Sequence, residues 1–249
     1  MIVDCHCHAG RGDDLTDPWT TDAPLGPYLR RARRAGIGRT VVVPTFPRDS
    51  RRGNRELGRI VAGGGGRLIG FAWVHPRRDA GRIDRLLDEA VRLGLRGIKV
   101  HAHNAMPTRE LCEAARRLRL PMLVDVFGKG HVVEMFAGQY PDVQFVVAHL
   151  GSFVDDWRAH QTVIDCMVRL PNVHADTSGV RRFDYLVEAV RRAGAHKLLF
   201  GSDGPWLHPG LELHKIRLMG LPAEQERLVT GGNLIRLLGR RAAPLRAAA

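Results

Sequence analysis

Short apolar runs recur along the whole chain and alternate with amphipathic stretches. The runs are rich in Val, Ile and Leu, which is typical of strands buried in a parallel sheet. The predicted strands span residues 2–5, 40–43, 68–74, 97–101, 122–126, 143–148, 173–176 and 197–200. Intervening segments such as 83–91 place apolar residues three and four positions apart, which predicts helices. The pattern therefore predicts repeated βαβ units.

The number of these units predicts the fold. Eight units in a chain of 249 residues are typical of a single α/β domain, the (β/α)8 TIM barrel. A doubly wound open sheet is the alternative, but the first strand lacks the Gly-x-Gly-x-x-Gly that follows it in many such sheets. We expect the barrel over residues 1–239 and a flexible tail over 240–249, where no periodic pattern continues.

The composition of the chain bears on whether its partner is a nucleic acid or a small molecule. The formal net charge is +12, and only four of the 38 basic residues are lysines. The arginines are spread over helical patterns and are not joined to an aromatic stacking pattern, so we expect a solvated surface and no nucleic-acid partner. A small-molecule substrate, including an anionic one, is compatible with this charge. A homo-oligomer is left open, because no clear interface stripe is visible.

The same composition bears on the cellular compartment. No run of 18 apolar residues is present, so we expect no membrane span. The N-terminus shows no basic and apolar leader, and four cysteines do not make a disulfide framework for a chain of this length. These features predict a cytoplasmic protein.

Two histidines end the first predicted strand. His6 and His8 lie two residues apart and so share one face of the strand. If that face points into the barrel, both imidazoles reach its mouth, where neutral imidazole is a common zinc ligand. Cys5 and Cys7 are then expected to point toward the helical layer, as small apolar residues.

Further polar residues stand at other strand ends. Asp203 follows the last strand, which barrel closure places beside the first. His149 ends the sixth strand, Asp125 ends the fifth, and Lys99 and His101 share one face at the end of the fourth. Chemistry in such barrels occurs at the C-terminal ends of the strands. A single histidine there is more often structural, but the combination predicts a metal site.

Together these residues resemble the amidohydrolase superfamily, in particular the amidohydrolase-related group that includes aminocarboxymuconate-semialdehyde decarboxylase. The resemblance extends from the first strand to the last helix. Its motifs are Val3-Asp4-Cys5-His6-Cys7-His8, Gly97-Ile98-Lys99-Val100-His101, Ala148-His149-Leu150-Gly151, Asn172-Val173-His174-Ala175-Asp176-Thr177-Ser178, Phe200-Gly201-Ser202-Asp203-Gly204-Pro205 and Gly232-Asn233-Leu234-Ile235-Arg236-Leu237-Leu238.

The resemblance implies one divalent metal ion, Zn2+ before Mn2+, held by His6, His8 and Asp203. It also implies that His149 acts as a catalytic base on the metal-bound water or on the substrate, while Asp203 ligates the metal and shuttles a proton. The implied function is a metal-dependent hydrolase that uses a metal-activated water to cleave an amide, ester or lactone bond of a small substrate. A non-oxidative decarboxylase of the same superfamily is the alternative.

One position departs from the group. A histidine ligand usually stands four residues after a proline on the fifth strand, and here Pro121 is followed at that spacing by Asp125. We expect Asp125 to replace it as a metal ligand, which makes the ion a weaker Lewis acid because a second carboxylate neutralises its charge. The alternative is that Asp125 pairs with Lys99 and the metal site is incomplete. A metal-free, non-catalytic barrel then stays open as a third hypothesis.

Substrate contacts are expected from three residues. We assign Lys99 and His101 to substrate binding, since the strand-five histidine that accompanies a bridging lysine in two-metal relatives is missing. Arg51, in the segment after the second strand, could bind a carboxylate in bidentate fashion or could lie on the surface. The loop over residues 10–24 is long enough to cover the mouth of the barrel.

Overall fold

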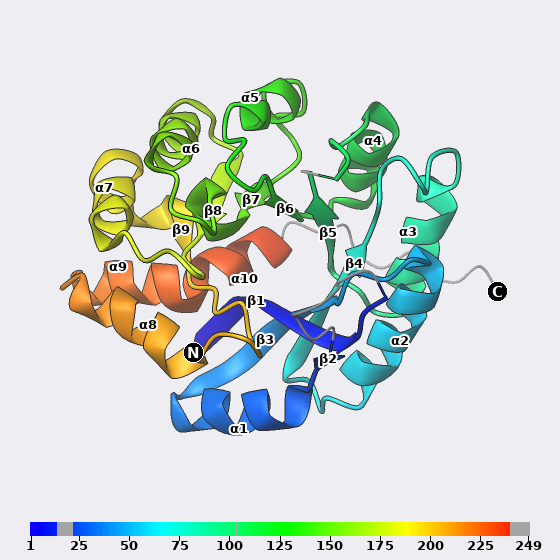
Figure 1. Ribbon diagram of the computed structural model, residues 1–249, viewed down its shortest axis with the longest axis horizontal. Coiled ribbons are helices and arrows are strands. Elements are labelled where there is room, and N and C mark those ends of the chain that lie inside the picture. Colours follow the sequence, from blue (N-terminus) through cyan, green and yellow to red (C-terminus); the bar gives the residue numbers. More distant parts are fainter. Residues whose placement is uncertain (14–21, 103, 240–249) are drawn as a thin grey trace.

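The computed structural model describes residues 1–13, 22–102 and 104–239, and a curled nine-stranded sheet occupies its centre (Figure 1). Neighbouring strands run parallel, except that β2 is antiparallel to β1, and the order is β2-β1-β3-β4-β5-β6-β7-β8-β9. The strands are β1 (Ile2–Arg11), β2 (Asp22–Ala23), β3 (Ile37–Pro44), β4 (Leu68–Trp73), β5 (Gly97–His101), β6 (Met122–Asp125), β7 (Phe145–Val147), β8 (Val173–Asp176) and β9 (Leu198–Leu199).

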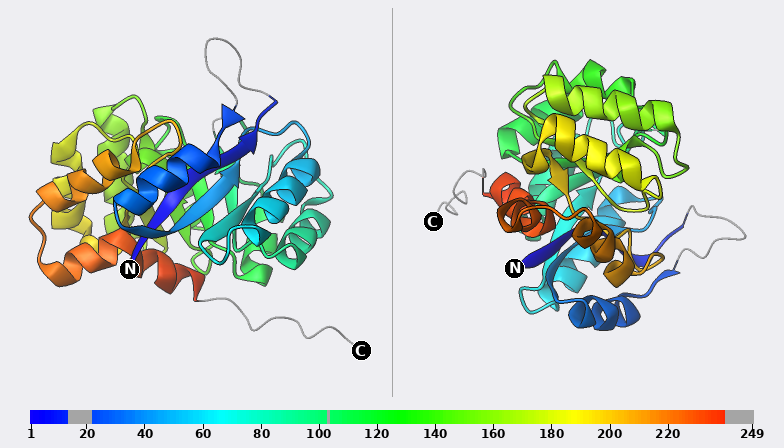
Figure 2. Two further views of the ribbon diagram at one scale, coloured as in Figure 1. Left: turned by 90° about the horizontal axis from the view of Figure 1, so that it is seen from below. Right: turned by 90° about the vertical axis from the view of Figure 1, so that its left-hand side faces the viewer.

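Helices cover the sheet, nearly all of them on its outer side (Figure 1). They are α1 (Leu25–Arg34), α2 (Ser50–Ala62), α3 (Ile83–Arg92), α4 (Arg109–Leu118), α5 (Val132–Ala137), α6 (Trp157–Arg169), α7 (Phe183–Ala193), α8 (Pro209–Leu218), α9 (Ala223–Arg227) and α10 (Asn233–Leu238), with the short elements η1 (Ala148–Gly151), η2 (Ala195–Lys197) and η3 (Leu228–Gly232). Helix α10 lies near the N-terminus, at the end of the sheet where the strands begin (Figure 2).

The mixed α/β class is as predicted, and all eight expected strands are present. The sheet has nine strands rather than eight because β2 adds a two-residue antiparallel pairing to the far end of β1. Two residues are too few to leave a hydrophobic pattern in the sequence.

The segment after β9 lies alongside β1. The backbone N–H of Cys5 donates to the carbonyl of Phe200 at 2.9 Å, and the N–H of Asp203 donates to the carbonyl of His6 at 2.8 Å. Cys7 and Gly204 form an isolated parallel bridge. The strand that carries the two histidines is therefore held against the segment that carries Asp203.

Two apolar layers pack against the sheet. The inner cluster contains alternate strand residues such as Val3, Val41 and Phe71, and Leu234 and Leu237 of α10 pack with them. A larger outer cluster lies between the strands and the surrounding helices. The strands are thus apolar on both faces, as expected for a parallel sheet.

The prediction for the cysteines is half right. Cys7 packs in the outer cluster with Tyr28 and Ala32 of α1, but Cys5 lies in the inner cluster with Val3. The pairing of β1 with β3 shifts register between Asp4 and Cys7, so strict alternation of side chains is interrupted there. Both His6 and His8 nevertheless lie on one face.

Two predictions lie outside the described residues: most of the 10–24 loop over the mouth, and the tail over 240–249. In the parts of the chain that the structure describes, no helix has the length and apolar character needed to cross a membrane.

Candidate metal centre

Three ligand atoms converge at the C-terminal end of the sheet. Oδ1 of Asp203 lies 3.3 Å from Nε2 of His8 and 3.6 Å from Nε2 of His6, and all three residues are buried. Ligands held at 2.0–2.1 Å around a tetrahedral zinc ion are about 3.3 Å apart. The donor types and their spacing therefore fit a divalent ion bound by these three predicted residues.

Asp4 holds the two segments of this centre together. Its Oδ1 accepts hydrogen bonds from the backbone N–H of His6 at 3.0 Å and of Ser202 at 2.9 Å. Its Oδ2 accepts from the hydroxyl groups of Tyr28 and Ser202. The carboxyl group is fully buried, and burial raises its pKa to about 7 in spite of these hydrogen bonds.

The tautomer of His6 follows from its neighbours. Its Nδ1 lies 3.0 Å from Oδ2 of Asp176, and a carboxylate only accepts, so Nδ1 carries the hydrogen. The lone pair is then on Nε2, which faces Asp203. Burial, reinforced by the charge of Lys99, lowers the pKa of His6 to about 4, so the ring is a neutral ligand at physiological pH.

The other two ligands are also in the protonation state that a metal requires. Burial lowers the pKa of His8. Burial of Asp203 opposes its ionisation, but its contact with His8 and the neighbouring rings of His6 and His149 outweigh this and lower its pKa to about 2. The centre therefore offers two neutral imidazoles and one carboxylate.

Lys99 is the nearest cation to the centre. Its Nζ lies 3.0 Å from Nε2 of His6, and its side chain is fully buried. Burial lowers its pKa, although Asp125, Asp176 and Asp203 oppose the effect. Since Nε2 of His6 carries a lone pair, Lys99 is the donor in this contact.

His149 lies beside the metal ligands, with its ring centroid 5.1 Å from that of His6. It belongs to η1, where it adopts a left-handed backbone conformation with φ of 56°. Its Nδ1 donates to the carbonyl of Ser178 at 2.8 Å, which leaves a lone pair on Nε2. Burial opposes protonation of this ring, but the charges of Asp203, Asp125 and Asp176 outweigh it and raise the pKa.

Asp125 and His101 form a pair at neighbouring strand ends. Oδ2 of Asp125 lies 3.4 Å from Nδ1 of His101, and its Oδ1 accepts from the backbone N–H of Phe127 at 2.9 Å. The carboxylate thus faces these two residues. The predicted role of Asp125 as a metal ligand remains a prediction.

Arg51 is directed to the helical layer. It lies on α2, and its Nε donates to Oε2 of Glu89 on α3 at 2.7 Å. The structure thus brings His6, His8, Asp203, Lys99 and His149 together, and leaves the substrate contact predicted for Arg51 as an expectation.

Asp176 was not predicted as a site residue, yet it contacts both His6 and His149. It ends β8 and is fully buried. The same criterion that selected Asp125 and Asp203, a polar residue where an apolar strand ends, would have selected it.

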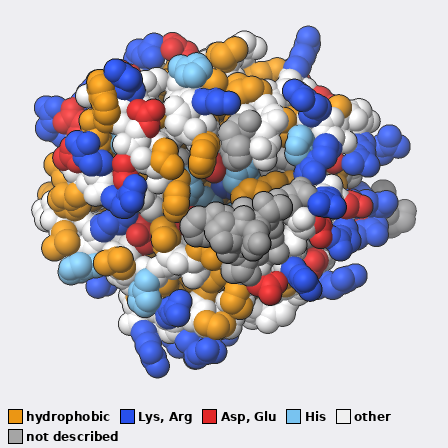
Figure 3. Space-filling model, viewed as in Figure 1, with side chains coloured by type: hydrophobic (Ala, Val, Ile, Leu, Met, Phe, Trp, Pro, Cys, Tyr) orange, Lys and Arg blue, Asp and Glu red, His pale blue; other side chains and the backbone are white. Residues whose placement is uncertain are grey.

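Aromatic rings near the centre were also missed. The ring of His8 lies 4.6 Å from that of Trp206, and Phe46 lies 4.6 Å from His101 and 5.3 Å from Trp73. No sequence pattern marks these residues, because they stand on separate segments. The space-filling view is hollowed near its centre, with hydrophobic side chains beside the opening (Figure 3).

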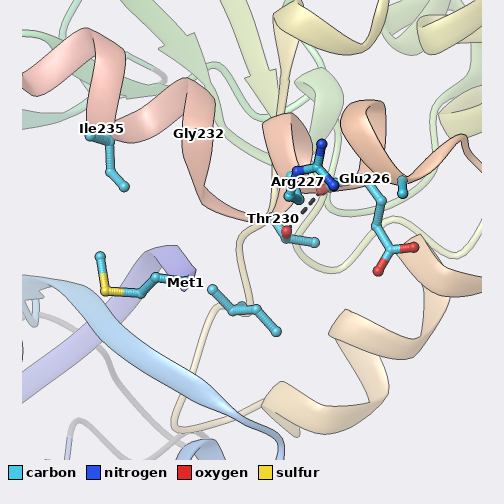
Figure 4. Close-up of a pocket in the computed structure, with 8 residues that line it drawn as sticks. Met1, Glu226, Arg227, Thr230, Gly232 and Ile235 are labelled. Carbon is cyan, nitrogen blue, oxygen red and sulfur yellow. Dashed lines mark hydrogen bonds between the residues drawn. The ribbon is translucent and has the colours of Figure 1, made fainter.

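A second cavity, of about 450 Å³, lies where β1 begins and thus at the opposite end of that strand from His8. Residues Met1 and Ile2 line it together with residues of α9, η3 and α10 (Figure 4). It is remote from the convergent histidines.

Comparison with known proteins identifies the family of the chain. A family model described as amidohydrolase matches residues 3–240. Among curated protein sequences, none matches the chain significantly. Several solved structures share its fold. One is an amidohydrolase from Burkholderia multivorans with bound zinc, which is 17% identical, with 96% of this chain and 99% of that chain covered and a TM-score of 0.77.

Two further structures are similar. A dihydroxybenzoic acid decarboxylase from Polaromonas, with bound manganese and the inhibitor 2-nitroresorcinol, is 17% identical over 97% of this chain and 98% of that chain, with a TM-score of 0.73. A candidate 2-pyrone-4,6-dicarboxylic acid hydrolase from Pseudomonas putida is 20% identical over 96% and 97%, with a TM-score of 0.72. These likenesses show the fold. The family model spans all the residues of the centre, and the chain therefore belongs to the amidohydrolase family.

Proposed function

We propose that this protein is a metal-dependent hydrolase that cleaves an amide, ester or lactone bond of a small substrate. The observation that carries this proposal is that His149, with a lone pair on Nε2, lies beside three convergent ligand atoms of His6, His8 and Asp203. One zinc or manganese ion bound there would act as a Lewis acid and lower the pKa of a coordinated water.

His149 is proposed to accept and return the proton during the reaction. Nε2 of His149 would accept a proton from the water that attacks the substrate, and the neighbouring carboxylates favour the protonated ring. The hydrogen bond from Nδ1 to Ser178 keeps the ring oriented throughout. His149 can then return the proton to the leaving group. Lys99 and His101 are proposed to bind an anionic group of the substrate.

The fold that supports this chemistry is proposed to be a (β/α)8 barrel over residues 1–239. The hydrogen bonds between β1 and the segment Phe200–Gly204 support closure of the sheet. Closure is functionally important because His6 and Asp203 come from opposite ends of the chain.

Elemental analysis of protein purified without a chelator tests the proposal. We expect about one zinc or manganese ion per chain, and loss of activity on removal of the ion, with recovery on its return. Activity is measured on a panel of small carboxylated lactones, esters and amides. Protein that contains no metal and takes up none from excess divalent ion would contradict the proposal and favour a non-catalytic barrel.

A non-oxidative decarboxylase is the second candidate, and a specific observation favours it. The rings of Phe46, Trp73 and Trp206 cluster with His8 and His101, and flat apolar surfaces suit an aromatic acid. The similar Polaromonas protein is a decarboxylase of such an acid. Incubation of the metal-loaded protein with 2,6-dihydroxybenzoate separates the two candidates, because decarboxylation releases carbon dioxide and hydrolysis does not.

A further inference from the structure

The geometry assigns Asp176 as the positioning residue that fixes the tautomer of His6 and the orientation of His149, so that both rings present Nε2 with a free lone pair. This inference deepens the proposed function, because it rests on the metal centre formed by His6, His8 and Asp203. Asp176 contacts neither the ion nor the substrate in this assignment. It acts through the two histidines.

Both oxygens of Asp176 are fully engaged. Oδ2 accepts from Nδ1 of His6 at 3.0 Å. Oδ1 accepts from the backbone N–H of His149 at 3.1 Å, from the backbone N–H of Ser178 at 2.9 Å and from the hydroxyl of Ser178 at 2.6 Å. A carboxylate has about four acceptor sites. His6, His149 and Asp176 are close enough to hold a second ion, but four donors already occupy this carboxylate.

The link to His149 runs through Ser178. The hydroxyl of Ser178 donates to Asp176 and lies 3.0 Å from Nδ1 of His149, while the carbonyl of Ser178 accepts from the same Nδ1. Asp176 thereby orders the short segment that orients the base. The bond to the backbone N–H of His149 also holds the left-handed turn of η1 in place.

The substitution Asp176→Asn should reverse the tautomer of His6. Three donors surround the position of Oδ1, so the amide oxygen of Asn must point toward them. The amide NH2 group then faces Nδ1 of His6, which has to become an acceptor and move its hydrogen to Nε2. A ring with hydrogen on Nε2 has no lone pair there for the ion.

The first test measures this tautomer in the whole protein without metal. Nitrogen NMR of histidine-labelled protein should show hydrogen on Nδ1 of His6 in the wild type and on Nε2 in Asp176→Asn, with His6→Ala used to assign the signal. Hydrogen on Nε2 in the wild type would overturn the inference. This measurement needs no variant at position 176 to fold, and it stays informative if the protein binds no metal and the proposed function fails.

The second test measures zinc affinity by competition with a chelator. Loss of such an outer partner typically weakens metal binding 10- to 100-fold, and we expect about this loss in Asp176→Asn. Asp79→Asn is the matched control, since Asp79 is a buried carboxylate away from the metal centre. It accepts from the hydroxyl of Ser50, the backbone N–H of His75 and the guanidinium of Arg82. We expect its zinc affinity to stay at the wild-type value. Equal losses in both variants, or none in Asp176→Asn, would show that Asp176 has no specific role at the metal centre.

Discussion

Nζ of Lys99 lies 3.0 Å from Nε2 of His6, the same nitrogen that faces Asp203. One lone pair cannot serve a lysine donor and a metal ion together. The contact between Lys99 and His6 and the proposed ligation by His6 therefore exclude each other, so Lys99 competes with the proposed ion for this nitrogen.

Replacing Lys99 tests this competition. We expect Lys99→Met to bind zinc more tightly, on the order of tenfold or about 1.4 kcal/mol, because the competing donor and its charge are both removed. Competition with a chelator gives the affinity. Weaker binding in Lys99→Met would instead show that this lysine supports the ion.

The roles of His6 and His149 should separate in their variants. His6→Ala removes a ligand, so its metal content should fall from about one ion per chain to almost none. His149→Asn should keep the ion but lose about 100- to 10,000-fold in kcat, the usual contribution of a general base. Metal content and kcat are measured on the same preparations. Equal loss of metal in both variants would make His149 a ligand.

The variant Asp125→Asn tests whether Asp125 is a metal ligand. Because Asp125 faces His101 and the backbone of Phe127, we expect the variant to retain about one ion per chain. The amide oxygen can still accept from Phe127, so the variant should also fold. A marked drop in metal content would establish Asp125 as the fourth ligand that the sequence predicts.

Asp4 should make stability depend on pH. Its pKa is about 7 in the folded protein against 3.8 ordinarily, so between about pH 4 and pH 7 the folded state holds a proton that the unfolded state has lost. The free energy of unfolding should therefore fall as pH rises through this window, by up to about 1.4 kcal/mol per pH unit.

Asp4→Asn provides the comparison, because the amide mimics the protonated acid and can donate to Tyr28 or Ser202. Urea unfolding of both proteins at pH 5 and pH 7, with chelator present, isolates the contribution of Asp4. The unfolding free energy of the wild type minus that of Asp4→Asn should rise from pH 7 to pH 5, because only the wild type gains stability from protonation in this window. A difference that is equal at both pH values would contradict the raised pKa.

Much of the fold could be predicted from the sequence, because buried parallel strands leave long apolar runs. The positions of His6, His8, Asp203 and His149 followed from the same argument, since each stands where such a run ends. These predictions required only where each strand ends and that the last strand lies beside the first.

Other features depend on side-chain conformation or local irregularity, which spacing does not encode. The orientation of Asp125 toward His101 is a choice of rotamer. The inward position of Cys5 results from a register shift in β1. The pairing of Arg51 with Glu89 depends on how α2 and α3 pack, and the segments that carry Phe46 and Trp206 meet only in the folded chain.

The backbone of the centre carries a consequence for engineering. His149 and Asp203 both adopt φ values above 50°, a region that residues other than glycine occupy at an energetic cost. Glycine at either position would relieve that strain while removing the reactive group. Selection of variants for heat resistance alone would thus favour replacing residues to which we assign the chemistry, and a screen for robust forms of this protein has to score turnover at the same time.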